Sequence, residues 1–173
     1  MRKIVATLLA PLFLTACAQM AAQPRSSAGR SAEAKDMALV GIYDLQARSA
    51  YQPVIHRQGN RFIAYIGHHG GSALNPLTGK QEPNGTSVVD VTDPRSPKYL
   101  AHIPGSAAGA GEAGGAQMVR VCDGKELPKG DPKKTYLLRT LGNEGHEIWD
   151  VTDSAKPTLS SEGSRVLYPR DHG

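Results

Sequence analysis

The chain has 173 residues, with 20 lysines and arginines against 16 aspartates and glutamates, which gives a formal net charge of +4. This modest excess, without a dense Lys/Arg patch, excludes a nucleic-acid-binding surface. The 19 glycines and 12 prolines separate short apolar runs, and this pattern favours short elements joined by turns.

The N-terminus has the pattern of a bacterial export signal. Arg2 and Lys3 precede the apolar run 4–14, which is shorter than the roughly 20 residues of a spanning helix. The run ends in Leu14-Thr15-Ala16-Cys17, which resembles the lipobox of bacterial lipoproteins. We therefore predict a signal peptide over residues 1–16 and acylation of Cys17. The alternative is an ordinary signal in which Cys17 is incidental.

Residues 17–36 are predicted to form a flexible linker behind the lipid. They contain almost no large apolar side chain and cannot bury enough surface to offset the entropy of ordering. Removal of residues 1–16 takes away two basic residues and no acid, which lowers the net charge to +2. The predicted location is the bacterial cell envelope, where the Cys17 lipid anchors the protein in a membrane.

Residues 37–173 are predicted to be all-β. Eight short β-prone runs follow one another without a sustained helical period. The runs are 54–57, 62–66, 86–91 and 99–103, and then 117–122, 135–139, 146–151 and the segment from Thr158. Residues 166–168 are interpreted as the start of a further unit.

The two series of runs are copies of one unit. The segment 87–93 recurs as 147–153, a spacing of 60 positions. Four short strands per unit, repeated at a fixed period, are typical of a β-propeller blade. The insertions 70–85 and 123–134 explain why the period exceeds that of ordinary blades.

The repeated segment predicts a strand that ends in a turn. Asp93 and Asp153 favour turns by bonding nearby backbone N–H groups, and Pro97 and Pro157 prevent continuation of the strand. The pattern resembles the bacterial LVIVD repeat from about residue 54 to 168, although Ser154 stands where the repeat has proline. The resemblance implies a β-propeller in a secreted or surface lipoprotein, and it brings no catalytic residues.

The length of the repeat region bears on the completeness of a ring. Residues 37–173 supply about two units of 60, whereas a propeller typically closes with 4 to 8 blades. We expect the reading frame to continue beyond Gly173 with more repeats. The alternative is that several chains complete one ring.

Four residues form the candidate metal site, namely His68, His69, Glu144 and His146. Neighbouring blades are expected to bring them to one rim, where imidazole and carboxylate ligands suit zinc, copper or iron. The alternative is rim histidines without a ligand. Cys122, unpaired if Cys17 carries lipid, is expected to be a buried thiol, an intermolecular bridge or a cysteine whose partner lies outside the chain.

Two classes of function remain open from the sequence. The chain has neither a G-x-S-x-G elbow nor a phosphate-binding Gly-Lys-Ser/Thr, and Trp149 is interpreted as a packing aromatic. The first class is a tethered binding or scaffold module for a protein or glycan. The second is a metal-dependent envelope enzyme, an oxidoreductase or hydrolase, that uses the four candidate residues.

Overall fold

The computed structural model describes residues 35–106, 111–143, 145–160 and 165–166. The chain divides into two compact units, Met1–Ala38 and Leu39–Gly173. The second unit contains every described strand. The predicted signal peptide, Cys17 and almost all of the linker lie outside the described residues.

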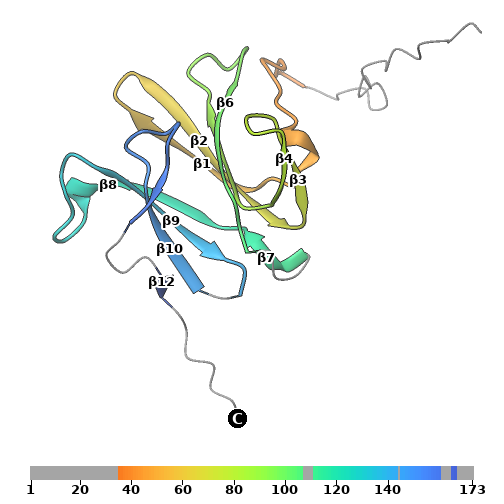
Figure 1. Ribbon diagram of the computed structural model, residues 1–173. Coiled ribbons are helices and arrows are strands. Elements are labelled where there is room, and N and C mark those ends of the chain that lie inside the picture. Colours follow the sequence, from red (N-terminus) through yellow and green to blue (C-terminus); the bar gives the residue numbers. More distant parts are fainter. Residues whose placement is uncertain (1–34, 107–110, 144, 161–164, 167–173) are drawn as a thin grey trace, which may run out of the picture. The chain divides into compact units, whose positions relative to one another are not determined.

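The first sheet is a four-stranded antiparallel meander (Figure 1). Its order is β1-β2-β5-β6, and a fifth strand, β7, pairs with the end of β2. The strands are β1 (Tyr51–Gln58), β2 (Arg61–Gly70), β5 (Thr86–Asp90) and β6 (Lys98–Ile103).

The second sheet repeats this meander with the order β8-β9-β10-β11. Its strands are β8 (Val119–Asp123), β9 (Thr135–Leu141), β10 (Gly145–Asp150) and β11 (Thr158–Leu159). The all-β prediction with blade-like antiparallel sheets is confirmed. β12 (Arg165–Val166) pairs with β10 on the same edge as β11. Val166 therefore belongs to this sheet, and residues 167–168 of the interpreted further unit lie outside the described residues.

Both insertions contain structure that the sequence did not indicate. The first insertion forms a hairpin of β3 (Ser72–Asn75) and β4 (Lys80–Pro83). The second holds the 3-10 helix η2 (Gly124–Glu126). The glycine-rich stretch β7 (Gly111–Ala116) pairs with β2.

Close backbone packing explains Gly115 of β7. Gly115 has φ +76°, and a Cβ there would lie 2.3 Å from the carbonyl oxygen of His68. Only glycine tolerates both this conformation and this approach. The glycine-rich stretch is therefore an added strand at the end of the first sheet.

The threonine of the repeated motif, Thr92 or Thr152, accepts an equivalent hydrogen bond in both sheets. Thr92 Oγ1 accepts the backbone N–H of Phe62 at 3.0 Å, and Thr152 Oγ1 accepts that of Thr135 at 3.1 Å. Each hydroxyl satisfies a donor at the start of the second strand of its sheet. The motif thus joins the end of the third strand to the start of the second.

The repeated aspartate completes this connection. Arg61 Nε lies 3.0 Å from Asp90 Oδ2, and Lys134 Nζ lies 3.1 Å from Asp150 Oδ2. Each aspartate also accepts the backbone N–H of the threonine two residues later. These contacts agree with a turn-forming role for the motif.

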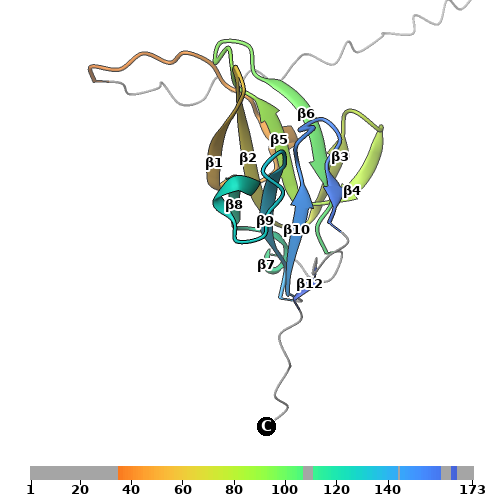
Figure 2. The same cartoon turned by 90° about the vertical axis from the view of Figure 1, so that its left-hand side faces the viewer.

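The main core lies between the two sheets, which Figure 2 shows side by side. We call the side of each sheet that contributes to this core its inner face, and the opposite side its outer face. The buried core residues are Ile63, Tyr65, Val88, Ala101 and Ile103 of the first sheet and Val119, Leu137 and Val151 of the second unit of the repeat.

Polar contacts also join the sheets. Gln58 Nε2 donates to the carbonyl of Val151 at 2.9 Å, and His56 Nε2 lies 3.0 Å from Asp123 Oδ1. Both donors project from β1, so the first strand of one sheet is bonded to the neighbouring sheet at two points.

A buried ion pair lies at the same interface. Arg139 is 1% exposed, and its guanidinium donates to Glu147 Oε2 at 2.7 Å and to the backbone carbonyls of Ile103 and Pro104 at 2.9 and 2.6 Å. Trp149 Nε1 donates to the same carboxylate oxygen at 2.9 Å. Burial lowers the pKa of Arg139, and the carboxylate opposes this shift. We call this group the Arg139 network.

We predict that Arg139→Met lowers the free energy of unfolding by about 3–5 kcal/mol, because it leaves a buried carboxylate without its partner. The double variant Arg139→Met/Glu147→Leu should lose less than the sum of the two single losses. Urea unfolding measures both. The exposed Arg120→Met is the control, and additive losses would contradict the coupling.

Candidate functional site

An apolar groove lies on the outer face of the first sheet. Its volume is about 530 Å³. We call it the outer groove. It is lined by Gly41, Ile42, Tyr43, Leu45, Ala50, Pro53, Ile55, Phe62, Ala64, Ile66, Val89, Val91, Pro94 and Pro97.

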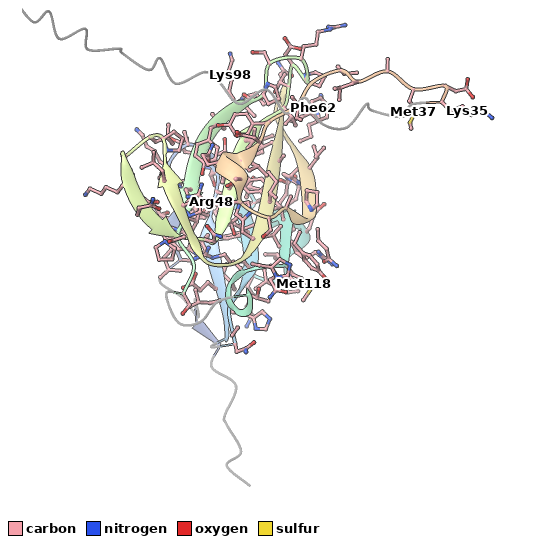
Figure 3. All side chains as sticks on the ribbon, turned by 90° about the vertical axis from the view of Figure 1, so that its right-hand side faces the viewer. Lys35, Met37, Arg48, Phe62, Lys98 and Met118 are labelled. Atoms are coloured by element: carbon pink, nitrogen blue, oxygen red, sulfur yellow. The ribbon has the colours of Figure 1, made fainter. Side chains whose placement is uncertain are left out.

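The floor of the groove follows from the strand sequence. Alternate residues of β2 point to opposite faces, so Ala64 and Ile66 face the groove while Ile63 and Tyr65 enter the main core. Two further lining residues are strongly exposed, with Ile55 at 63% and Phe62 at 45%. Figure 3 views this side of the first sheet and shows Phe62 at one end of it.

The segment before β1 forms one wall of the groove. Tyr43 stacks on Tyr99 with ring centroids 5.9 Å apart, and Leu45 belongs to a small core with Ala64, Ile66 and Val89. The 3-10 helix η1 (Leu45–Ala47) follows. This segment covers Ala64 and Ile66 of β2 and Val89 of β5, and the groove remains open at Ile55 of β1 and at Phe62 near the start of β2.

A buried polar cluster adjoins the groove along the same face. His68 is fully buried, and its Nε2 lies 2.7 Å from Ser87 Oγ. Its Nδ1 bonds the backbone carbonyl of Ser49. Because a carbonyl only accepts, Nδ1 carries the proton of the neutral ring, and Nε2 accepts from the Ser87 hydroxyl.

Arg48 attaches the same segment to the first insertion. It is 5% exposed, and it donates to Asn84 Oδ1 at 3.1 Å, the carbonyl of Ala73 at 3.0 Å and Gln46 Oε1 at 2.8 Å. Figure 3 shows Arg48 beside η1. The cluster therefore fixes the wall of the groove with hydrogen bonds.

Burial keeps the histidines of this cluster neutral. Desolvation lowers the pKa of His68 to about 4, the bond to Ser49 opposes the shift, and His102 and Arg48 add to it. Desolvation also lowers the pKa of His102, whose Nε2 bonds the carbonyl of Pro83 at 2.9 Å. Protonation of either ring would place a charge where the structure is poorly solvated.

The structure places the predicted metal ligands on different faces. His68 lies on the outer face of the first sheet, and His146 pairs with Thr140 on the outer face of the second. His69 is half-buried against Tyr51 at a centroid distance of 5.1 Å. Because the two sheets pack through their inner faces, His68 and His146 are not brought together.

Glu144 lies outside the described residues, so the four-residue metal site stays a prediction. Within the ranges that the structure describes, no three His, Cys, Asp or Glu side chains are grouped closely enough to hold a metal ion. Cys122 is half-buried on β8, and burial raises the pKa of its thiol. Trp149 packs against the main core, as interpreted from the sequence.

No protein family, curated protein or solved structure that we compared matches the chain. The resemblance to the LVIVD repeat thus rests on the residues of its two copies. None of the helices in the described part of the chain has the length and apolar character needed to cross a bilayer.

Sequence reasoning missed the outer groove, although it contained one usable signal. The run 62–66 is apolar at every position, which indicates a strand covered on both faces. The second face needed a cover, and Tyr43 and Leu45 supply part of it. The polar cluster had no such signal, because it joins Arg48 and Ser49 to residues far along the chain.

We predict that acid destabilises the fold through His68. The unfolded chain takes up this proton near pH 6.5, whereas the folded protein takes it up near pH 4. The unfolded state binds more protons between these values, so the free energy of unfolding falls as the pH is lowered through them, by up to about 3 kcal/mol.

Urea unfolding at a series of pH values measures this loss. The His68→Asn variant should be less stable at pH 7 and should lose most of the slope between pH 6.5 and 4, whereas the neighbouring His69→Asn should keep it. An equal slope in His68→Asn and the parent protein would contradict the assignment.

Proposed function

We propose that the protein is a lipid-anchored lipoprotein of the bacterial envelope, with LVIVD-type propeller blades that bind a protein partner. The outer groove is the observation that carries this proposal. It is an open apolar surface, and Ile55 and Phe62 expose side chains that a monomer would ordinarily cover.

The chemistry of the groove favours a protein over a glycan. Its lining consists of aliphatic residues, prolines and glycine, together with two aromatic side chains, and it contains no charged group. Sugar hydroxyls require hydrogen-bonding partners, and their loss on binding would cost free energy. An apolar face of a partner's β-sheet suits this surface, because the same positions of the second sheet pack against a sheet.

The anchor is tested by Cys17→Ser. The variant should move from the membrane fraction to the soluble fraction, because it cannot carry the acyl chains that hold the protein at the bilayer. Cell fractionation and the mass of the mature protein provide the measurement. The conservative control Cys122→Ser should stay with the membrane. Unchanged fractionation and mass in Cys17→Ser would contradict the proposal.

The binding role is tested with a photo-crosslinking residue at Ile55 in living cells. A partner in the groove should give one defined protein adduct, which mass spectrometry maps to an apolar strand of the partner. The same probe at Gln81, which is exposed on β4, is the matched control and should give no such adduct. No adduct at residue 55, or the same adduct at both positions, would overturn the groove as the binding site.

A further inference from the structure

We infer that the partner of the outer groove is a second copy of this chain, so that copies assemble head to tail. The inference rests on the proposed function and names the partner of the same groove. It follows from comparison of equivalent positions in the two sheets, because the chain carries both halves of one interface at its two outer faces.

Strand pairing fixes which positions are equivalent. Ile55 pairs with Ala64 and Ala64 with Val89 in the first sheet. Val121 pairs with Leu137 and Leu137 with Trp149 in the second. Val89 and Trp149 are 60 positions apart within the repeated motif. The floor of the groove therefore corresponds to Val121, Leu137 and Trp149.

These equivalent residues form an interface within the chain. Leu137 is fully buried, and Val121 and Trp149 pack around the main core against the first sheet. In the second sheet, this face is thus covered by the inner face of another sheet. The outer groove is the corresponding face of the first sheet, where the segment around Leu45 covers Ala64 and Val89 but leaves Ile55 and Phe62 exposed.

The second sheet carries the complementary face. Tyr65 pairs with Val88 on the inner face of the first sheet, and both are fully buried. The equivalent pair in the second sheet is Leu138 and Ile148, on its outer face. Leu138 is 42% exposed. The side chain at this position is therefore fully buried in the first sheet and exposed in the second.

The two open faces point away from each other in the packed pair of sheets, so a contact between them requires two copies. The outer face of the second sheet of one copy would lie on the outer groove of the next, as the first sheet lies on the second within the chain. Such a contact joins different surfaces and closes into a ring when the rotation permits. Because propellers close with 4 to 8 blades, copies that each contribute the two described sheets would form a ring of about two to four.

The test uses the full chain with Cys17→Ser, which keeps the protein out of membranes. Multi-angle light scattering after size exclusion should show an assembly of about two to four copies. The variants Ile55→Asp and Leu138→Asp each place a charge on one of the two faces, and each should be monomeric. Gln81→Asp, an exposed position on β4, should assemble like the parent protein.

A mixture of the two monomeric variants provides the decisive measurement. Each variant retains one intact face, so the mixture should form a 1:1 dimer that cannot grow further. Circular dichroism of each variant shows whether it is folded, and both substituted positions are exposed. A parent protein that is monomeric at all concentrations, or a mixture that stays monomeric while the parent assembles, would overturn the inference.

The cross-linking experiment separates this inference from the proposed function. An adduct at residue 55 that maps to residues 136–148 of a second copy supports both. An adduct with a protein of different sequence, together with a monomeric parent, overturns self-assembly and retains the binding role. A monomeric parent without any adduct at residue 55 overturns both.

Discussion

The packing of the two sheets depends on how Arg139 is buried between them. Burial of a guanidinium costs free energy unless its N–H groups find hydrogen-bond acceptors and its charge is paired. Here Glu147 supplies the charge, and the carbonyls of Ile103 and Pro104 supply the remaining acceptors. Arg139 and Glu147 both lie in the second sheet, and the carbonyls lie at the end of the first, so a displacement of either sheet breaks the two carbonyl bonds of the buried guanidinium. The apolar core supplies most of the buried area, and the Arg139 network selects one arrangement of the sheets.

The repeat is not symmetric at this position, and the difference explains why the two ends of the chain are not interchangeable. Arg139 pairs with Glu147 across β9 and β10, whereas the equivalent pair in the first sheet is Ile66 and Ser87. The buried charge of Arg139 therefore lies where a neighbouring sheet, here the first, supplies carbonyls that accept its hydrogen bonds. In the first sheet the same position is aliphatic and lies in the outer groove. Ser87 in the first sheet is hydrogen-bonded to His68, in the buried polar cluster beside the groove.

The sequence predicted those parts of the fold that local chemistry determines. The Asp-Val-Thr-Asp motif specifies a strand end and a turn within a few residues, so the third strand of each sheet and its neighbours were placed correctly. β7 was missed because its partner β2 lies far away in the sequence, and because a glycine-rich stretch has no side-chain alternation to reveal a strand. The β3–β4 hairpin is local, and it was missed because its glycines, prolines and asparagines were interpreted as a loop. The predicted grouping of His68 with His146 depended on a guessed distance between blades. The face on which each strand residue lies follows from register, and register was not visible until the bulges and pairings were known.

The outer groove and the polar cluster are parts of one structure. Arg48 and Ser49 are held by the cluster, and Ala50 and Pro53, directly after them, line the groove. Tyr43 and Leu45, which precede Arg48 in the chain, form the wall of the groove. Apolar packing alone is weakly directional, so it would let this segment slide over the sheet. Hydrogen bonds from buried neutral groups are directional and costly to break. They hold the segment over Ala64, Ile66 and Val89, and Ile55 and Phe62 beside it stay exposed.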